Sequence, residues 1–203
     1  MRTIKFLLSL MLLCTPIWAL AQEPVLLTVA MNHVTATNTS PKSISLIALK
    51  VNFDVPFSDM TRRDTTEVVH DFLFTGALAP QSEAEVLHPD KLLAEKLPQA
   101  KAVSAKLVFV RMVDGTTWRA TDKFIDMRMA LRKPILDFYR HALSAYSTAG
   151  VAALKDVLNA EDGPASGKAG FVNRVLVNAG EQAAVENIRT SLANASAHSS
   201  LIP

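Results

Sequence analysis

The spacing of apolar side chains changes once along the chain, near residue 121. Before that point the clearest pattern lies in the segment SISLIALKVNFDV, residues 43–55. Its odd positions from 47 to 55 are all apolar, whereas positions 50, 52 and 54 carry Lys, Asn and Asp. Because successive side chains of a strand point to opposite faces, this alternation predicts a strand with one buried face.

Turn signals separate this strand from its neighbours. The β-rich run at residues 25–37 ends at the cluster Asn38-Thr39-Ser40-Pro41-Lys42. Proline fixes a turn dihedral there, and an asparagine side chain can bond its own backbone. We therefore expect residues 25–37 and 43–55 to form two antiparallel strands joined by this turn.

Shorter elements follow. The segment TEVVHDFLFT, residues 66–75, has the apolar spacing of a strand, and Gly76 and Pro80 break it before a short strand at residues 83–87. The segment HPDKLLAEKLPQ, residues 88–99, predicts one or two helical turns, because proline suits both the first position of a helix and the position after its end.

The run KAVSAKLVFVRMV, residues 101–113, is apolar on both parities in its second half, which predicts a central strand covered on both sides. Asp114-Gly115 is a strong hairpin signal, so TTWRA should return antiparallel to this strand. Trp118 then lies opposite the stretch from Val110 to Met112. We interpret it as a residue at the edge of the core, and a ligand platform is the alternative.

After about residue 122 the apolar positions recur at intervals of three, four and seven, which predicts an amphipathic helix. The stripe consists of Phe124, Leu131, Ile135, Phe138, Ala142 and Tyr146. Pro134 should kink or divide it. A second helix is expected at residues 150–161 and a polar one at 181–195, whereas 171–180 fits a helix or a strand. The last ten residues should fray.

Three segments of the first half resemble the immunoglobulin-like accessory domains of exported bacterial proteins. They are NTSPKSISLIALKVNFDV, LAPQSEAEV and KLVFVRMVDGTTW, and the resemblance covers about residues 25–120. It implies a β-sandwich without catalytic residues. The expected fold is therefore α+β: an antiparallel immunoglobulin-like β-sandwich at residues 22–121, followed by a helical C-terminal segment at 122–203.

The first residues have the pattern of a signal peptide. Two basic residues, Arg2 and Lys5, precede an apolar run, and Ala19-Leu20-Ala21 offers the small residues that a signal peptidase recognises. We expect cleavage after Ala21 and a periplasmic or secreted protein. An uncleaved anchor fits less well, because the apolar run is shorter than the roughly 18 to 20 residues that span a bilayer.

Cleavage changes the composition. Loss of two of the 21 basic residues leaves 19 against 19 acidic ones, a neutral balance that argues against a nucleic-acid partner. The single cysteine, Cys14, is also lost, which removes disulfides, thiolate nucleophiles and cysteine-ligated metals from consideration. Lipid attachment at Cys14 is a weaker alternative, since the bulky Leu13 precedes it.

Two histidines stand beside carboxylates, at His70-Asp71 and His88-Pro89-Asp90. Imidazole and carboxylate can bind a metal, yet neighbouring strand residues point to opposite faces, so His70 and Asp71 should not bind one ion. The chain contains no HExxH or GxSxG pattern, and GPASGKAG at residues 163–170 lacks the spacing of a phosphate-binding loop. We therefore expect no catalytic residue, no metal and no cofactor.

A basic stretch on the first predicted helix is the candidate interaction site. It consists of Arg128, Arg132, Lys133 and Arg140. Such a stretch could dock on an anionic lipid surface or an acidic partner. The alternative is a helix that lies on the sandwich with its charges in water, and Asp137, at helical spacing from Arg140, favours it.

These observations lead to three functional hypotheses. The first is a non-catalytic binding or accessory protein of the bacterial envelope, with another envelope protein as its partner at an exposed sheet edge. The second is a small hydrolytic or metal-dependent enzyme whose site lies between sandwich and helices and uses His70, His88 or Asp90. The third is a peripheral membrane protein that docks through the basic helix.

Overall fold

A computed structural model of the protein describes residues 23–30, 33–57, 60–87 and 101–202. Two predictions lie outside the described residues. One is the signal peptide at residues 1–21, and the other is the pair of helical turns at 88–99, which includes His88 and Asp90.

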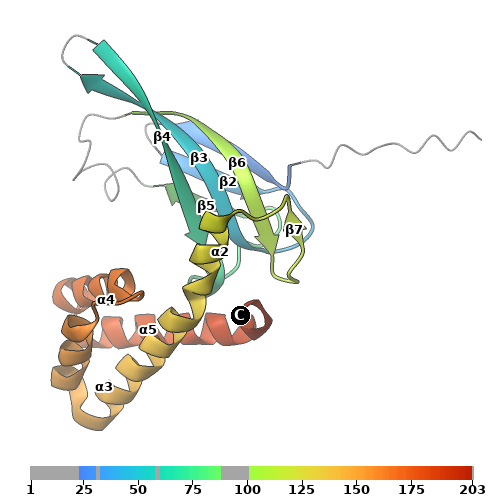
Figure 1. Ribbon diagram of the computed structural model, residues 1–203. Coiled ribbons are helices and arrows are strands. Elements are labelled where there is room, and N and C mark those ends of the chain that lie inside the picture. Colours follow the sequence, from blue (N-terminus) through green and yellow to red (C-terminus); the bar gives the residue numbers. More distant parts are fainter. Residues whose placement is uncertain (1–22, 31–32, 58–59, 88–100, 203) are drawn as a thin grey trace, which may run out of the picture.

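Two antiparallel sheets form the first half of the described chain (Figure 1). The three-stranded sheet has the order β1 (Val25–Ala30), β2 (His33–Asn38), β5 (Glu83–Leu87). The four-stranded sheet has the order β4 (Met60–Asp71), β3 (Ile44–Phe57), β6 (Lys101–Met112), β7 (Thr117–Trp118). Helices follow from Lys123 onward, so the fold is α+β, as the change in apolar spacing predicts.

The turn at Asn38 does not join two paired strands, so that prediction is wrong. β2 pairs with β1 and β5, whereas β3 pairs with β4 and β6. The physical reason is the fully buried side chain of Asn38. Its amide donates to the carbonyls of Lys42 (2.9 Å) and Leu78 (3.0 Å), and its Oδ1 accepts from the Ser40 N–H (2.9 Å). These bonds lead the chain from one sheet to the other.

The odd-numbered face of β3 forms the core between the two sheets, as the alternation predicts. Leu49, Val51 and Phe53 are buried there, and Val34 and Val86 of the three-stranded sheet pack in the same cluster. Burial of one such side chain stabilises a fold by roughly 1.5–3 kcal/mol. This shared core holds the two sheets together.

Helix α2 (Lys123–Ala130) covers the lower end of the opposite face of the four-stranded sheet (Figure 1). Leu46 of β3 and Phe109 of β6 form a small buried cluster there with Ile125 of the helix. Val110, the next residue of β6, points into the core between the sheets. The prediction that β6 is covered on both sides is therefore confirmed.

Three longer helices follow, α3 (Arg132–Ala160), α4 (Ser166–Ala179) and α5 (Glu181–Ala197). The predicted first helix is divided at Leu131, and Pro134 lies in the first turn of α3, where a backbone N–H would have no acceptor within that helix. Ala149 and Gly150 (φ +71°) are not helical and divide α3 in two, so the predicted second helix at 150–161 is present as the part of α3 that ends at Ala160. The ambiguous segment 171–180 is helical up to residue 179.

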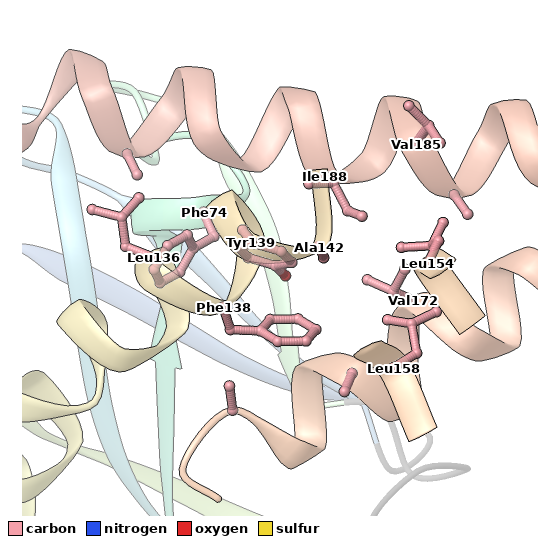
Figure 2. Packing of buried hydrophobic residues seen from close by; sticks show 14 of the residues in the cluster. Phe74, Leu136, Phe138, Tyr139, Ala142, Leu154, Leu158, Val172, Val185 and Ile188 are labelled. Carbon is pink, nitrogen blue, oxygen red and sulfur yellow. The ribbon is translucent and has the colours of Figure 1, made fainter. Parts of the chain in front are cut away.

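The helices enclose a hydrophobic cluster that also includes the end of the sheets (Figure 2). The short helix η1 (Phe72–Phe74) follows β4 directly and places Leu73 and Phe74 in this cluster. The Phe74 ring meets that of Tyr139 edge to face, with 5.7 Å between centroids. Ile188 of α5 lies in the same cluster. Apolar packing thus fixes the helical part, from α2 to the C-terminal end, to the end of β4.

The prediction that the last ten residues fray is wrong. α5 continues to Ala197, and the short helix η2 (Ser199–Leu201) follows it. Leu201 is 2% exposed, and its side chain belongs to the helical cluster. Its carbonyl accepts a hydrogen bond from Arg132 (3.0 Å). The apolar contacts of Ala195, Leu201 and Ile202 and the hydrogen bond from Arg132 hold this segment to the helices.

Trp118 lies opposite Val110 in the β6–β7 pair, as predicted. The turn between the strands contains Gly115 at φ +84°, a conformation that favours glycine. The Trp118 side chain is half-buried and packs against the core between the sheets. The Arg119 guanidinium lies over its ring, 4.1 Å from the centroid. These contacts support the interpretation of Trp118 as a residue at the edge of the core.

Replacing Trp118 by Ala should lower the free energy of unfolding by about 1–2 kcal/mol, because the cross-strand pair and part of the buried ring are lost. Urea denaturation of the two proteins measures the difference. Trp118→Phe, which keeps an aromatic ring against Val110, should recover part of the loss. An unchanged denaturation midpoint in Trp118→Ala would show that the ring does not contribute to the core.

Candidate functional site

A cavity of about 700 Å³ lies where the sheets meet the helical part, and we call it the junction cavity. The end of β4, the connection between α2 and α3, the start of α4 and the middle of α5 form its walls. Figure 1 shows these elements near the lower end of the sheets. Its lining includes Asp71, Phe74, Arg128, Ile135, Lys168 and Asn187.

Apolar side chains form one part of this lining. Val69 comes from β4, Leu131 and Ile135 come from the region where α3 begins, and Phe171 comes from α4. Phe74 joins them from η1. A ligand in the cavity therefore meets an apolar surface contributed by both halves of the chain.

The carboxylate of Asp71 and the guanidinium of Arg132 form a two-point ion pair beside the cavity. Nε of Arg132 donates to Oδ2 of Asp71 (2.8 Å), and Nη2 donates to Oδ1 (2.9 Å). Arg132 is fully buried, whereas the Asp71 side chain is 24% exposed. The parallel arrangement of two charge-assisted bonds fixes both side chains in orientation as well as position.

The same two residues also hold three backbone segments. Nη1 of Arg132 donates to the Leu201 carbonyl (3.0 Å), and Nη2 donates to the Ser45 carbonyl (3.5 Å). Oδ1 of Asp71 accepts from the N–H of Leu73 (3.0 Å) and thereby caps η1. The pair connects the start of β3, the end of β4, the start of α3 and the C-terminal end.

Arg132 is therefore not available at the surface, and the prediction that it belongs to an exposed basic stretch is wrong. Its guanidinium is fully buried against Asp71. Lys133 and Arg140 are exposed as expected, but both lie near Asp137, at 3.9 Å and 3.3 Å. That shared carboxylate offsets part of their charge. Of the four predicted residues, only Arg128 lines the junction cavity.

Lys168, at the start of α4, also lines the cavity. Burial lowers the pKa of its ammonium group, with Arg128 lowering it further and Asp71 acting in the opposite direction. The ammonium lies 5.9 Å from the centroid of the Phe74 ring. Among the described residues, neither Lys168 nor Arg128 has a carboxylate within ion-pair distance. Two cations therefore face the cavity without a direct counter-ion.

His70 also lines the cavity, but its ring is bound to the sheets. Burial lowers the pKa of His70, and the nearby Lys168 lowers it too, whereas a hydrogen bond to the Val86 backbone and the charge of Asp71 raise it. The ring packs on that of Phe72, with 4.5 Å between centroids. Since the lowering effects prevail, His70 is held in its neutral form more strongly than an exposed histidine.

Helices α3 and α5 add further polar groups to the lining. Burial raises the pKa of Tyr139, and a hydrogen bond with Ser191 opposes that effect. Oδ1 of Asn187 is buried and has no hydrogen-bond partner among the described residues. A buried carbonyl oxygen without a donor is costly, so Oδ1 of Asn187 is an unsatisfied acceptor in a residue that lines the cavity.

His70 and Asp71 are adjacent residues of β4, and both line the cavity. His70 bonds to Val86, and Asp71 bonds to Arg132, so the two side chains have different partners. Within the described residues, no three side chains of the His, Cys, Asp and Glu types gather as metal ligands would. The polar groups of the cavity instead include the cations Arg128 and Lys168, the hydrogen-bonded hydroxyl groups of Tyr139 and Ser191, and the Asn187 side chain.

Sequence reasoning missed Lys168 and Asn187 as site residues. Lys168 stands in the segment GPASGKAG, whose spacing does not fit a phosphate-binding loop. The structure places Lys168 on α4 instead of in a loop. Asn187 is one polar residue in a polar helix, and only the packing of α5 against the cavity distinguishes it.

No protein-family model, no curated protein and no solved structure matches this chain. Within the described ranges, none of the helices is long and apolar enough to pass through a membrane. The interpretation of the junction cavity therefore rests on its own residues.

Replacing Arg132 by Met should lower the free energy of unfolding by roughly 3–5 kcal/mol, because Asp71 and two carbonyls lose a buried partner. Urea denaturation measures the change. Arg140→Met is the matched control, since it removes an exposed arginine from an ion pair on the same helix and should cost about 0–1 kcal/mol. Equal losses in the two variants would contradict a structural role for the buried pair.

The stability of the protein should depend on pH through His70. Because the folded state lowers the pKa of this group, the unfolded chain binds a proton first as the pH falls below about 6.5. The contribution of neutral His70 is therefore complete above about pH 6.5 and is lost below it, with a slope of at most about 1.4 kcal/mol per pH unit.

Urea denaturation between about pH 7.5 and pH 5.5 tests this dependence. His70→Gln should have a shallower slope than the unmodified protein, whatever its absolute stability. His141→Gln is the control, because His141 is exposed on α3 and its loss should leave the slope unchanged. The same slope in all three proteins would show that His70 does not titrate differently in the folded state.

Proposed function

We propose that this protein is a non-catalytic binding protein of the bacterial cell envelope and that the junction cavity holds its ligand. The observation that carries the proposal is the cavity itself, which measures about 700 Å³ and has both apolar and polar or charged side chains in its lining. Ligand sites for small molecules have roughly 300–1,000 Å³, combine apolar surface with polar groups that orient the ligand, and occur where two parts of a protein meet.

Binding without catalysis fits the bonds that His70 and Asp71 make. Both oxygens of Asp71 accept hydrogen bonds from Arg132, and one of them also caps η1. The His70 ring bonds to the Val86 backbone. A general base needs a free acceptor aimed at the proton that it removes. Both oxygens of Asp71 are engaged in holding the junction, so the enzyme hypothesis has less support at this carboxylate.

We also propose that the two sheets form an immunoglobulin-like sandwich. The orders β1-β2-β5 and β4-β3-β6-β7 support this assignment, because β2 lies between β1 and β5 in one antiparallel sheet and the two sheets share one core. Sandwiches of this kind occur in many cell-surface and exported domains. The signal-like sequence at residues 1–21 supports the same location.

Two further contacts of the proposed protein have weaker support. β4 is an edge strand, so an envelope partner could pair with it, but charged residues such as Arg62 and Arg63 protect the strand. Docking of the basic helix on a membrane surface is weakened because Lys133 and Arg140 share Asp137 and because Arg132 is buried. The junction cavity is therefore the primary site of this proposal.

Binding of the neutral dye Nile red, followed by its fluorescence, tests whether the cavity accepts a ligand. We expect saturable binding at one site. Gly167 lines the cavity, and a Cβ atom there meets no atom within 4 Å, so Gly167→Phe can place a ring in the space without a backbone clash. This variant should bind the dye at least about tenfold more weakly, a loss of about 1.4 kcal/mol.

Gly170→Phe is the matched control on the same helix. Its Cβ atom would approach only the flexible Arg174 side chain, at 4.0 Å, and Gly170 does not line the cavity. This variant should keep the affinity of the unmodified protein. Absence of saturable binding, or equal weakening in both variants, would contradict the proposal.

A further inference from the structure

We infer that the ligand of the junction cavity is an amphipathic anion, with one carboxylate or phosphate group held by Lys168 and Arg128 and an apolar body against Phe74 and Ile135. This inference deepens the proposed function and rests on it. It assigns the chemical class of the ligand, which the volume of the cavity leaves open.

The charges around the cavity favour an anion. Lys168 and Arg128 both line it, and each lacks a direct carboxylate partner among the described residues. Their charges repel each other, since Arg128 lowers the pKa of Lys168. Asp71 is the carboxylate beside them, but Arg132 already binds both of its oxygens. The lining therefore has an excess of positive charge that a bound anion would neutralise.

Burial strengthens this preference. The Lys168 ammonium is partly withdrawn from water, and burial is the main cause of its lowered pKa. A partly buried charge gains more from a counter-ion than an exposed one, because less water screens the pair. The first turn of α4, which contains Gly167 and Lys168, also directs the positive end of a helix dipole to the same region.

The apolar lining lies directly beside these cations. The Lys168 ammonium is 5.9 Å from the centroid of the Phe74 ring, which is itself part of the cavity lining. Ile135 and Phe171 continue the apolar surface from α3 and α4. A small hydrophilic ion such as inorganic phosphate would leave this surface uncovered, whereas a molecule with a hydrocarbon portion would bury it.

Asn187 adds one further feature to the expected ligand. Its buried Oδ1 has no hydrogen-bond partner among the described residues, so it can accept a bond from a hydroxyl or N–H group. This acceptor comes from α5, whereas Arg128 is on α2 and Lys168 is on α4. An amphipathic anion that also carries one donor would match the cavity better than one without it.

Displacement of Nile red from the purified protein tests the inference with four compounds that share a ten-carbon chain. They are decanoate, decyl phosphate, decanol and decylammonium, each used below its micelle concentration. Decanoate or decyl phosphate should bind at least about tenfold more tightly than decanol, and decylammonium should bind most weakly. The two anions distinguish a carboxylate from a phosphate group, and inorganic phosphate alone should not displace the dye.

Lys168→Met removes the charge and keeps most of the apolar volume. It should weaken binding of the preferred anion about tenfold and leave decanol binding unchanged or tighter. Lys133→Met is the matched control, because Lys133 is an exposed lysine outside the cavity lining. This control should leave both affinities unchanged.

The outcomes separate the two proposals. If decanol and the anions bind equally and Lys168→Met changes neither, the cavity binds ligands but the anion inference is overturned. If none of the compounds displaces the dye and the dye itself does not saturate, the proposed function is overturned as well. Tighter binding of decylammonium than of decanoate would also contradict the inference.

Discussion

The ion pair between Asp71 and Arg132 is the constraint on which the junction depends. Asp71 is the last residue of β4, and Arg132, 61 positions later in the sequence, is the first residue of α3. Burying a guanidinium is costly unless its nitrogens find partners, and all three nitrogens of Arg132 donate to Asp71 or to the carbonyls of Ser45 and Leu201. The pair therefore fixes where the helices attach more than it adds to stability.

This attachment creates the junction cavity and sets its charge. With Asp71 bound to Arg132, no other carboxylate of the described residues lies within ion-pair distance of Lys168 or Arg128. If Asp71 were free, it would attract both cations and close the positive side of the cavity. The same pair that joins the sheets to the helices thus leaves a site that favours an anion. One interaction, the Asp71–Arg132 ion pair, thus accounts for the attachment of the helices and for the charge of the proposed binding site.

The elements with a single buried face were predictable, whereas the contacts between distant segments were not. Alternation along residues 47–55 gave the buried face of β3, and the change of spacing near residue 121 gave the α+β class. The buried amide of Asn38 sends the chain between sheets through a bond to Leu78, 40 positions away. Arg132 lies outside the apolar stripe of the predicted helix, as a surface residue would, and only its ion pair with the distant Asp71 shows that it is buried. Lys168 and the cavity were not predictable for the same reason, because the cavity is formed by segments that are distant in the sequence.

Hydrogen–deuterium exchange with and without saturating decanoate tests the central claim, that the junction is one site built from remote segments. The account predicts added protection together at three places: the end of β4 near Asp71, the start of α4 near Lys168, and the α5 segment from Asn187 to Ser191. These segments share the cavity and little else. Protection confined to the outer edge of β4 or to the exposed face of α3, with none at these three places, would contradict the account.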